Sequence, residues 1–272
     1  MSVTTIKTTL PTGGREHVMP AGYACIFYSK LGRKSHVYLA DWHTDDEPFT
    51  PLAGVSSVTK CADDGSTFSK GAWWGMGIGA EGTRDLIEYR DVKLSALQGL
   101  DRKALSALLS EHKLSTNHVR DTAGNVGTTI HKAIESYFRT SHLPNPDDYN
   151  EAVQPKLRGA IKYLTEKDPE PIHTEIVVCS RTHACAGTLD LYCLEDGKPA
   201  LRDFKSGSYL PLEHGIQLGG YEGLGQEAGY LPAMELDRAV VQLLPDDYKI
   251  HRPGHTFDDF LAYLACYRIS KR

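Results

Sequence analysis

Apolar residues in the second half of the chain recur at the spacings of helices and strands. Between residues 127 and 140 they follow a period of three to four, which is typical of a helix with one apolar face; the positions are Ile130, Ile134, Tyr137 and Phe138. Residues 151–167 predict a second helix. Three strand-like runs follow, at 173–180, 184–194 and 199–207.

The last two of these runs are joined by a hairpin signal. The connecting residues include Asp196-Gly197, a pair that two-residue hairpin turns favour because both positions need a positive φ. Residues 212–229 then predict a helix, residues 233–244 lead into a strand, and residues 257–269 predict a closing amphipathic helix. The order is therefore helix, three strands, helix, strand, which indicates an α/β fold.

The first half of the chain is less regular. Residues 36–43 alternate like a strand, and residues 45–57 are rich in turn formers. From Ser56 onward the pattern predicts helices interrupted by glycines, and residues 101–120 predict a further helix. We expect residues 1–120 to be an N-terminal, mainly helical extension and residues 121–272 to be the core with its C-terminal helix.

Composition excludes several classes of protein. A membrane-spanning helix needs about 18 consecutive apolar residues, and the 272 residues contain no such run. The first twenty residues also lack the apolar centre of a secretion signal. We therefore expect a cytoplasmic protein without a membrane partner. The six cysteines form no CxxC pair, which favours reduced thiols. The net charge of −5 argues against a passive nucleic-acid coat but not against an enzyme that gathers carboxylates around metal ions.

The third strand carries the strongest chemical signal. Two-residue alternation places Asp203 and Lys205 on one face and Phe204 on the other. Asp190, on the preceding strand, lies as far from the hairpin turn as Asp203 does, so the two carboxylates can sit opposite each other. Such a pair repels unless a cation lies between, and Mg²⁺ or Mn²⁺ suits oxygen ligands. An alternating strand with solvated charges is the plainer interpretation of Asp203 and Lys205 alone.

Four short motifs in register change that interpretation. They pair Gly127 with His131, Gly187 with Asp190, Asp203 with Lys205, and Gln217 with Tyr221. In spacing, order and predicted secondary structure they resemble the GxxxH, GxxD, DxK and QxxxY motifs of RecB-like PD-(D/E)XK nucleases, over about residues 120–245. The resemblance implies a restriction-endonuclease-like core, a central mixed sheet flanked by helices in the order αβββαβ.

The resemblance also implies roles for individual residues. His131, Asp190, Asp203 and the backbone carbonyl of Phe204 look like metal ligands, and Lys205 looks like the catalytic lysine. Gln217 and Tyr221 share a helix face beside the site, where such pairs contact DNA or position other groups; an ordinary helix face is the alternative. Glu135 is either a hydrogen-bond partner of His131 or a solvent-exposed residue. Glu175 is either a second-metal or substrate-end ligand or a structural residue.

The region before the core resembles phage-encoded RecB-like exonucleases, including relatives of CRISPR-associated nucleases. In these the helices arch over the active site. Trp73 or Trp74 is a candidate for stacking on a base, although core aromatics are the more common interpretation. The candidate phosphate contacts are Lys60, Lys70 and Arg84.

One departure concerns cofactors. Many CRISPR-associated relatives hold an iron–sulfur cluster with three closely spaced cysteines near the C-terminus, whereas here only Cys266 follows Cys193, so we expect no such cluster. No phosphate-binding GxxxxGK[ST] motif occurs, so we expect no nucleotide cofactor.

Together these features favour a Mg²⁺- or Mn²⁺-dependent DNA exonuclease. By the resemblance it would act at linear duplex or single-stranded ends in phage or prophage recombination, replication or repair, in the host cytoplasm. A single-strand-annealing or recombination protein is a candidate partner, and a homo-oligomer is a candidate assembly. The alternatives are a flap or single-strand endonuclease and, from another class, a catalytically idle DNA-binding module.

Overall fold

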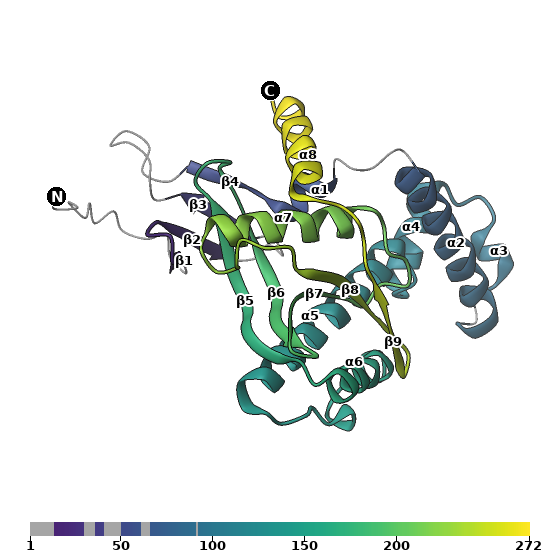
Figure 1. The fold of residues 1–272 in the computed structure, drawn as a ribbon. Coiled ribbons are helices and arrows are strands. Elements are labelled where there is room, and N and C mark those ends of the chain that lie inside the picture. The colour runs from purple at the N-terminus through teal and green to yellow at the C-terminus, as the bar shows by residue number, and fades with distance from the viewer. Residues whose placement is uncertain (1–13, 30–35, 41–49, 61–65, 91) are drawn as a thin grey trace.

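The computed structural model of this chain describes residues 14–29, 36–40, 50–60, 66–90 and 92–272. They form a curled mixed sheet flanked by helices (Figure 1). The strands are β1 (Gly14–Val18), β2 (Ala24–Ser29), β3 (His36–Ala40), β4 (Thr50–Gly54), β5 (Glu170–Ser180), β6 (Cys185–Glu195), β7 (Lys198–Lys205), β8 (Asp237–Leu244) and β9 (Asp247–His251). The helices are α1 (Val55–Thr59), α2 (Ser66–Tyr89), α3 (Leu94–Leu97), α4 (Arg102–Glu111), α5 (Thr116–Thr140), the short 3-10 helix η2 (Pro146–Asp148), α6 (Gln154–Lys167), α7 (Glu213–Glu227) and α8 (Phe257–Ser270).

The sheet divides at β6. The strand order is β1-β2-β3-β4-β6-β7-β8-β9, and β5 pairs with β6 along its other edge. On the edge opposite β5, β4 pairs in parallel with residues 185–186 of β6 and β7 pairs antiparallel with residues 191–195. Residues 187–190, which include Asp190, have no ladder partner on that edge among the described strands.

Helices cover both faces of the sheet. The buried side chains of α7 and α8 pack on one face, against residues such as Leu201 and Val240. Those of α5 and α6 pack on the other, against Phe204 and Val241. Neighbouring residues of one strand reach opposite cores because side chains alternate between faces, which explains why the adjacent Val240 and Val241 are both apolar.

The structure confirms most elements expected in the second half. The two-residue hairpin is present: Glu195 pairs with Lys198, and Asp196 and Gly197 have φ values of 52° and 72°, as an Asp-Gly turn of this type requires. The sequence did not predict the last strand of the sheet, β9. Only two residues separate it from β8, and its five residues do not alternate clearly between apolar and polar.

Three expectations about the first half are wrong. Residues 101–120 were expected to form one helix, whereas α4 ends at Glu111 and α5 begins at Thr116. Residues 45–57 are rich in turn formers, yet β4 lies within them. It is a strand because it pairs with β3 and with β6. The predicted helix interruptions after Ser66 are absent, because α2 continues through its glycines. A Cβ at Gly82 would lie only 2.9 Å from the Leu114 carbonyl oxygen, so this glycine allows the segment after α4 to approach the helix closely.

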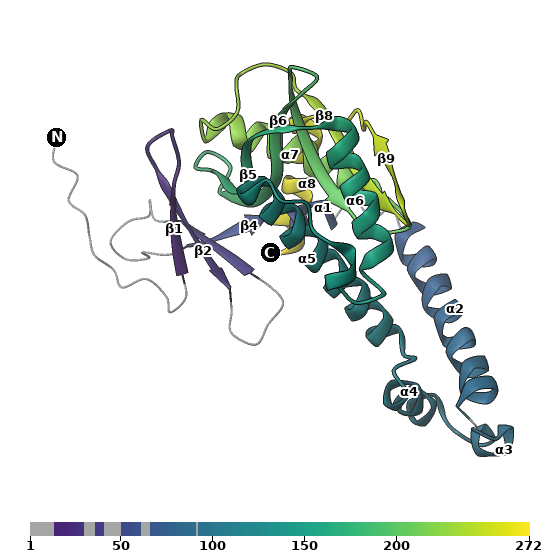
Figure 2. The ribbon, with the colours of Figure 1, turned by 90° about the horizontal axis from the view of Figure 1, so that it is seen from below.

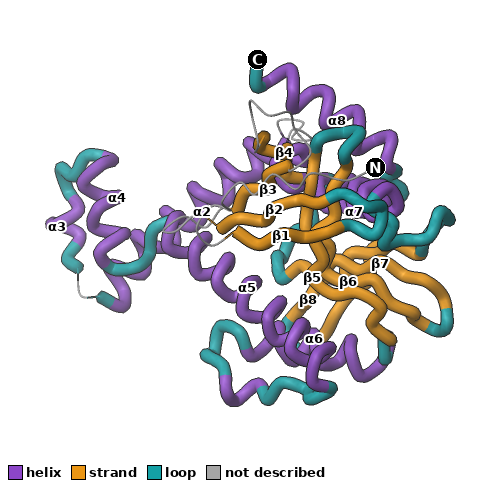
Figure 3. Tube along the Cα trace, turned by 90° about the vertical axis from the view of Figure 1, so that its left-hand side faces the viewer, coloured by secondary structure: helices purple, strands orange, loops and turns teal. Residues whose placement is uncertain are grey.

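Helices α2, α3 and α4 and the first part of α5 form an arm (Figures 1, 2 and 3). Its distal end, with α3 and α4, projects away from the sheet in all three views. The domain boundary expected at residue 120 falls inside α5, and β1–β4 join the same sheet as β6. None of the described helices carries an apolar stretch long enough to cross a membrane.

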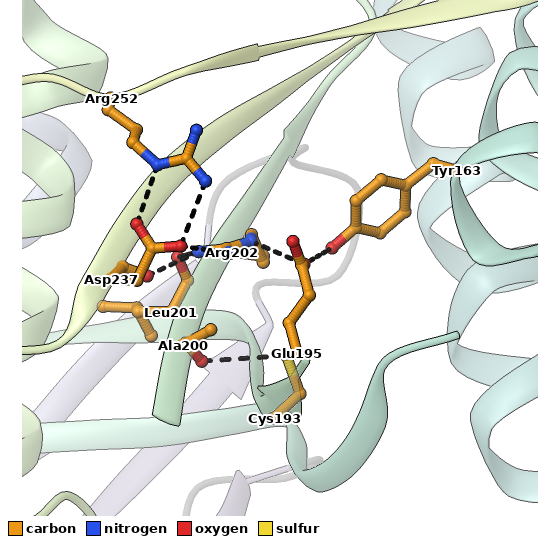
Figure 4. A network of polar contacts seen from close by, with 8 residues as sticks. All are labelled: Tyr163, Cys193, Glu195, Ala200, Leu201, Arg202, Asp237 and Arg252. Atoms are coloured by element: carbon orange, nitrogen blue, oxygen red, sulfur yellow. Dashed lines mark hydrogen bonds and ion pairs between the residues drawn. The ribbon is translucent and has the colours of Figure 1, made fainter. Parts of the chain in front are cut away.

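A buried arginine fixes β7 within the sheet (Figure 4). The Arg202 side chain is 0% exposed, and its guanidinium donates to Glu195 Oε2 at 3.0 Å and to Asp237 Oδ2 at 2.7 Å. Tyr163 on α6 donates to the same Glu195 oxygen at 2.8 Å, and Arg252 donates to Asp237 Oδ1 at 2.9 Å. The network therefore connects β7 to β6, to β8 and to α6. Its central residue, Arg202, immediately precedes Asp203.

Glu195→Ala should destabilise the protein by about 3 kcal/mol, because it removes one of the two carboxylate partners of a buried guanidinium and leaves only Asp237. Urea unfolding followed by circular dichroism measures this. The matched control is Asp247→Ala, which breaks an exposed ion pair with Lys162 of 2.8 Å and should change the unfolding midpoint little. Equal effects of the two changes would contradict the importance of burial.

Candidate metal centre

Helix α5 brings His131 to the point where β6 and β7 part. The helix lies there because Ile130 and Ile134, on its apolar face, are buried in the same core as Phe204. His131 Nε2 lies 2.9 Å from the carbonyl oxygen of Phe204. Its other ring nitrogen, Nδ1, lies 3.6 Å from Asp190 Oδ2.

Asp190 is anchored to the neighbouring strand. Its Oδ2 accepts a hydrogen bond of 2.8 Å from the backbone N–H of Phe204. Counting on from the Leu191–Arg202 pair places Asp190 level with Asp203, as their equal distances from the hairpin turn predicted. The backbone pairing of β6 with β7 stops at Leu191 and Arg202, so Asp190 and Asp203 are not themselves a ladder pair.

Glu175 joins this cluster from β5. The pairs Thr174–Leu191 and Ile176–Leu189 place it opposite Asp190, and its Oε1 lies 3.5 Å from His131 Nδ1. Its φ of 49° is in the left-handed region, which costs a non-glycine residue about 1–3 kcal/mol. Of the two interpretations for Glu175, this position next to His131 and Asp190 favours the ligand.

Asp203 and Lys205 extend from the end of β7 beside the cluster. The Asp203 side chain is only 1% exposed, and neither carboxylate oxygen accepts a hydrogen bond of normal geometry from a described residue. Lys205 Nζ lies 2.5 Å from Asp203 Oδ2 as an ion pair. Phe204 points the other way into the core, as alternation predicted. A buried carboxylate with this little hydrogen bonding is costly unless a cation balances it.

The crowding of charges shifts the pKa of several groups. Burial raises the pKa of Asp190 to about 6, with His131 opposing the shift and Asp203 adding to it. Burial lowers the pKa of His131, but Asp190 and Glu175 outweigh this effect and raise it to about 9. Burial also lowers the pKa of Lys205, but Asp203 and Asp190 outweigh it and hold the pKa above the usual value for lysine. The site thus attracts positive charge.

The donor set fits a divalent cation. His131, Glu175 and Asp190 each offer one ligand atom, and these three atoms lie within 4.8 Å of one another. The carboxylate of Asp203 and the carbonyl of Phe204 adjoin them, as the hydrogen bond from His131 and the effect of Asp203 on Asp190 show. One imidazole among several oxygens suits Mn²⁺ or Mg²⁺.

Gln217 and Tyr221 lie together on the buried face of α7. Gln217 Nε2 donates to Tyr221 Oη at 2.6 Å and lies 3.4 Å from Ser56 Oγ. Burial raises the pKa of Tyr221 well above its usual value, so the phenol stays protonated. A Cβ at Gly187 would lie 2.6 Å from the Tyr221 ring and 2.9 Å from Val55. The Tyr221 ring therefore packs directly against Gly187.

The glycine of the first motif has a similar role. A Cβ at Gly127 would lie 3.1 Å from Ser206 Oγ, so α5 approaches the end of β7 closely there. Lys156 on α6 donates a hydrogen bond to the Ser206 carbonyl oxygen. Two helices therefore hold the chain just after Lys205.

The remaining predicted residues lie outside this cluster. Glu135 is half-buried on α5, and its carboxylate makes no hydrogen bond or ion pair with another described residue. Lys60 is exposed after α1. Arg84 is exposed on α2 and forms an ion pair with Asp85 at 3.2 Å. Three belong to α2 but have side chains outside the described part of the structure: Lys70, Trp73 and Trp74.

Two residues near the site were not anticipated. His214, in the first turn of α7, lies close enough to the site to feel its charges: burial, together with the Lys205 ammonium, lowers the pKa of His214 to about 4. Its position three residues before Gln217, on the same helix face, was the available signal. Arg202 was overlooked because a charged residue next to Asp203 suggests solvent, and only the sheet shows it to be buried.

Comparison with known proteins adds no assignment to this geometry. No protein-family model matches the chain, and no curated protein matches it.

Proposed function

We propose that this protein is a metal-dependent deoxyribonuclease that hydrolyses phosphodiester bonds from DNA ends. One observation carries the proposal: His131, Glu175 and Asp190 gather their ligand atoms beside a buried carboxylate, Asp203. Among the described residues, the only cation that pairs with Asp203 is the Lys205 ammonium. A structural role does not require five acidic or basic side chains at the open edge between two strands. Phosphodiester hydrolysis does use such a set.

The divalent cation would be held by His131, Asp190, Glu175, Asp203 and the carbonyl of Phe204. When bound, Mg²⁺ or Mn²⁺ supplies polarisation of the scissile phosphate and a bound water of lowered pKa. His131 can bind a metal ion only as a neutral imidazole. Because its pKa is raised to about 9, it must first lose a proton that it holds at neutral pH.

The raised pKa of Lys205 defines its role. Because the side chain is an ammonium at neutral pH, it donates hydrogen bonds and does not abstract a proton. Asp203 holds its Nζ at 2.5 Å, beside the proposed metal ligands. There it would stabilise the negative charge that develops on the phosphate oxygens.

The position of the four motifs supports the nuclease over an idle module. Each motif glycine admits a neighbour that holds a chemical group in place: Gly127 lets α5 carry His131 to β7, and Gly187 lets Tyr221 pack against β6. A module that only bound DNA would need neither the pKa shifts nor the unsatisfied Asp203 carboxylate. Digestion from ends follows from the resemblance in the motifs and is tested directly below.

Asp203→Asn and Lys205→Met should each lower the rate of DNA cleavage by about 10²-fold or more, because each removes a charge from the reacting centre. The assay follows end-labelled linear DNA and closed-circular DNA with Mg²⁺, Mn²⁺ or EDTA. Linear DNA should disappear only with metal, and circles should persist.

The matched controls are Asp258→Asn and Lys249→Met, which make the same chemical changes at exposed positions on α8 and β9 and should leave the rate unchanged. Cleavage of circles would replace the exonuclease by an endonuclease. Undiminished cleavage by Asp203→Asn would refute the proposed site.

Mn²⁺ affinity should rise with pH between about 6 and 9. Asp190, with a pKa of about 6, and His131, with a pKa of about 9, must both lose a proton to bind metal, so acid competes with the ion. Calorimetric titration in buffers of different ionisation enthalpy measures both the affinity and the protons released.

His131→Asn should weaken Mn²⁺ binding and flatten the pH dependence near pH 9, because a proton on His131 no longer competes with the ion. Affinity that is constant or falls with rising pH in the unaltered protein would contradict these ligands.

A further inference from the structure

A cavity of about 300 Å³ lies on the α7 face of the sheet, where Val240 is part of its lining. It lies between the start of α7, the strands β8 and β9, and the segment that leads into α8. Its size is at the lower end of the ~300–1,000 Å³ typical of small-molecule sites, which suits one heterocyclic ring with its attached sugar.

The strand register places this cavity relative to Asp203. Asp203 pairs with Val240 on β8, and Val240 pairs with His251 on β9, so the three residues form one row across the sheet. Val240 and His251 both line the cavity. Two strand spacings amount to roughly 10 Å, which is comparable with the span of a single nucleotide. His214, whose pKa responds to both Lys205 and Asp203, also lines it.

The walls of the cavity are held in place by buried contacts. Arg238 forms an ion pair with Glu222 at 3.2 Å and donates to the His255 carbonyl oxygen at 2.5 Å. A Cβ at Gly215 would lie 2.6 Å from the His255 ring, so this glycine brings α7 directly against that segment. The cavity is therefore a preformed feature of the fold.

The lining combines rings and apolar groups. Three imidazoles, of His214, His251 and His255, face it together with the side chains of Leu212 and Val240. The one arginine of the lining, Arg252, is engaged with Asp237 at 2.9 Å. His214 Nδ1 is buried and has no hydrogen-bond partner among the described residues. These walls suit a flat, uncharged ring with hydrogen-bonding edges better than a phosphate or another anion.

We propose that this cavity binds the base of the nucleotide next to the scissile phosphate, with the imidazoles of His214, His251 and His255 contacting its ring. This inference rests on the proposed nuclease function. It gives the site a means to hold a strand whose base is unpaired, because a base enters the cavity only when it has left its duplex. Recognition by stacking tolerates any base, so it adds affinity without sequence preference.

Abasic substitution tests the base contact directly. Oligonucleotides carry one abasic residue, moved one position at a time from either end, and their binding to Lys205→Met protein in Mn²⁺ is measured by fluorescence anisotropy. We expect one position, or two adjacent ones, to weaken binding about tenfold and the others to have little effect.

Filling the cavity should abolish this pattern. Leu212→Trp places a large ring at the exposed rim, and it should weaken binding of the intact strand about tenfold and remove the sensitive position. Leu143→Trp makes the same change at a similarly exposed leucine on the loop after α5 and should bind like the parent. His251→Leu, which keeps the volume but removes the imidazole, is a second variant in case Leu212→Trp unfolds; thermal melting verifies each fold.

The outcomes separate this inference from the proposed function. Metal-dependent cleavage by the unaltered protein with no sensitive abasic position, or with the same sensitivity in Leu212→Trp, overturns the base pocket and leaves the nuclease standing. Failure of the unaltered protein to cleave any DNA overturns both.

Discussion

The buried guanidinium of Arg202 is the interaction on which the geometry of the site depends. It has no exposed surface, and it ties β7 to both neighbouring strands through Glu195 and Asp237. A charge in that position is stable only with its partners in place, so the network resists any shift of β7 along the sheet. Asp203, Phe204 and Lys205 follow immediately, and their positions inherit this constraint.

Beyond Arg202 the balance of charge reverses. The charge of Arg202 is paired through direct hydrogen bonds to carboxylates. Among the described residues, Asp203 has only an ion pair with Lys205, and Asp190 lies close to Glu175. Burial raises the pKa of Asp190 to about 6, with Asp203 adding to the shift. The carboxylates of Asp190 and Glu175 outweigh burial and raise the pKa of His131 to about 9. Such a site stores electrostatic energy that a divalent cation would release on binding. The strained φ of Glu175 is a further local cost at the same place.

The glycines of the motifs have a structural meaning that complements the chemistry. Gly187 and Gly127 are not needed for unusual backbone angles, since neither has a positive φ. At Gly187 a side chain would collide with Tyr221 and Val55, and at Gly127 it would be in tight contact with the Ser206 hydroxyl. Each glycine therefore marks a close contact between two elements, and His131 or Asp190 follows it within four residues. This explains how four short and individually weak patterns can indicate a single location.

The sequence by itself determined the order of the main helices and strands after residue 120, apart from β9, together with the hairpin at Asp196-Gly197 and the shared face of Asp203 and Lys205. These follow from local periodicity and turn chemistry, which depend on residues near one another in the chain. It also pointed to His131, Asp190 and Asp203, through motif spacing. Only the tertiary structure decided that Glu175 joins the cluster, that Arg202 is buried, that β4 enters the sheet and that His214 borders the site. Each of these depends on partners many residues away, and the burial, pKa and sheet pairing of a residue are set by those partners and not by its neighbours in sequence.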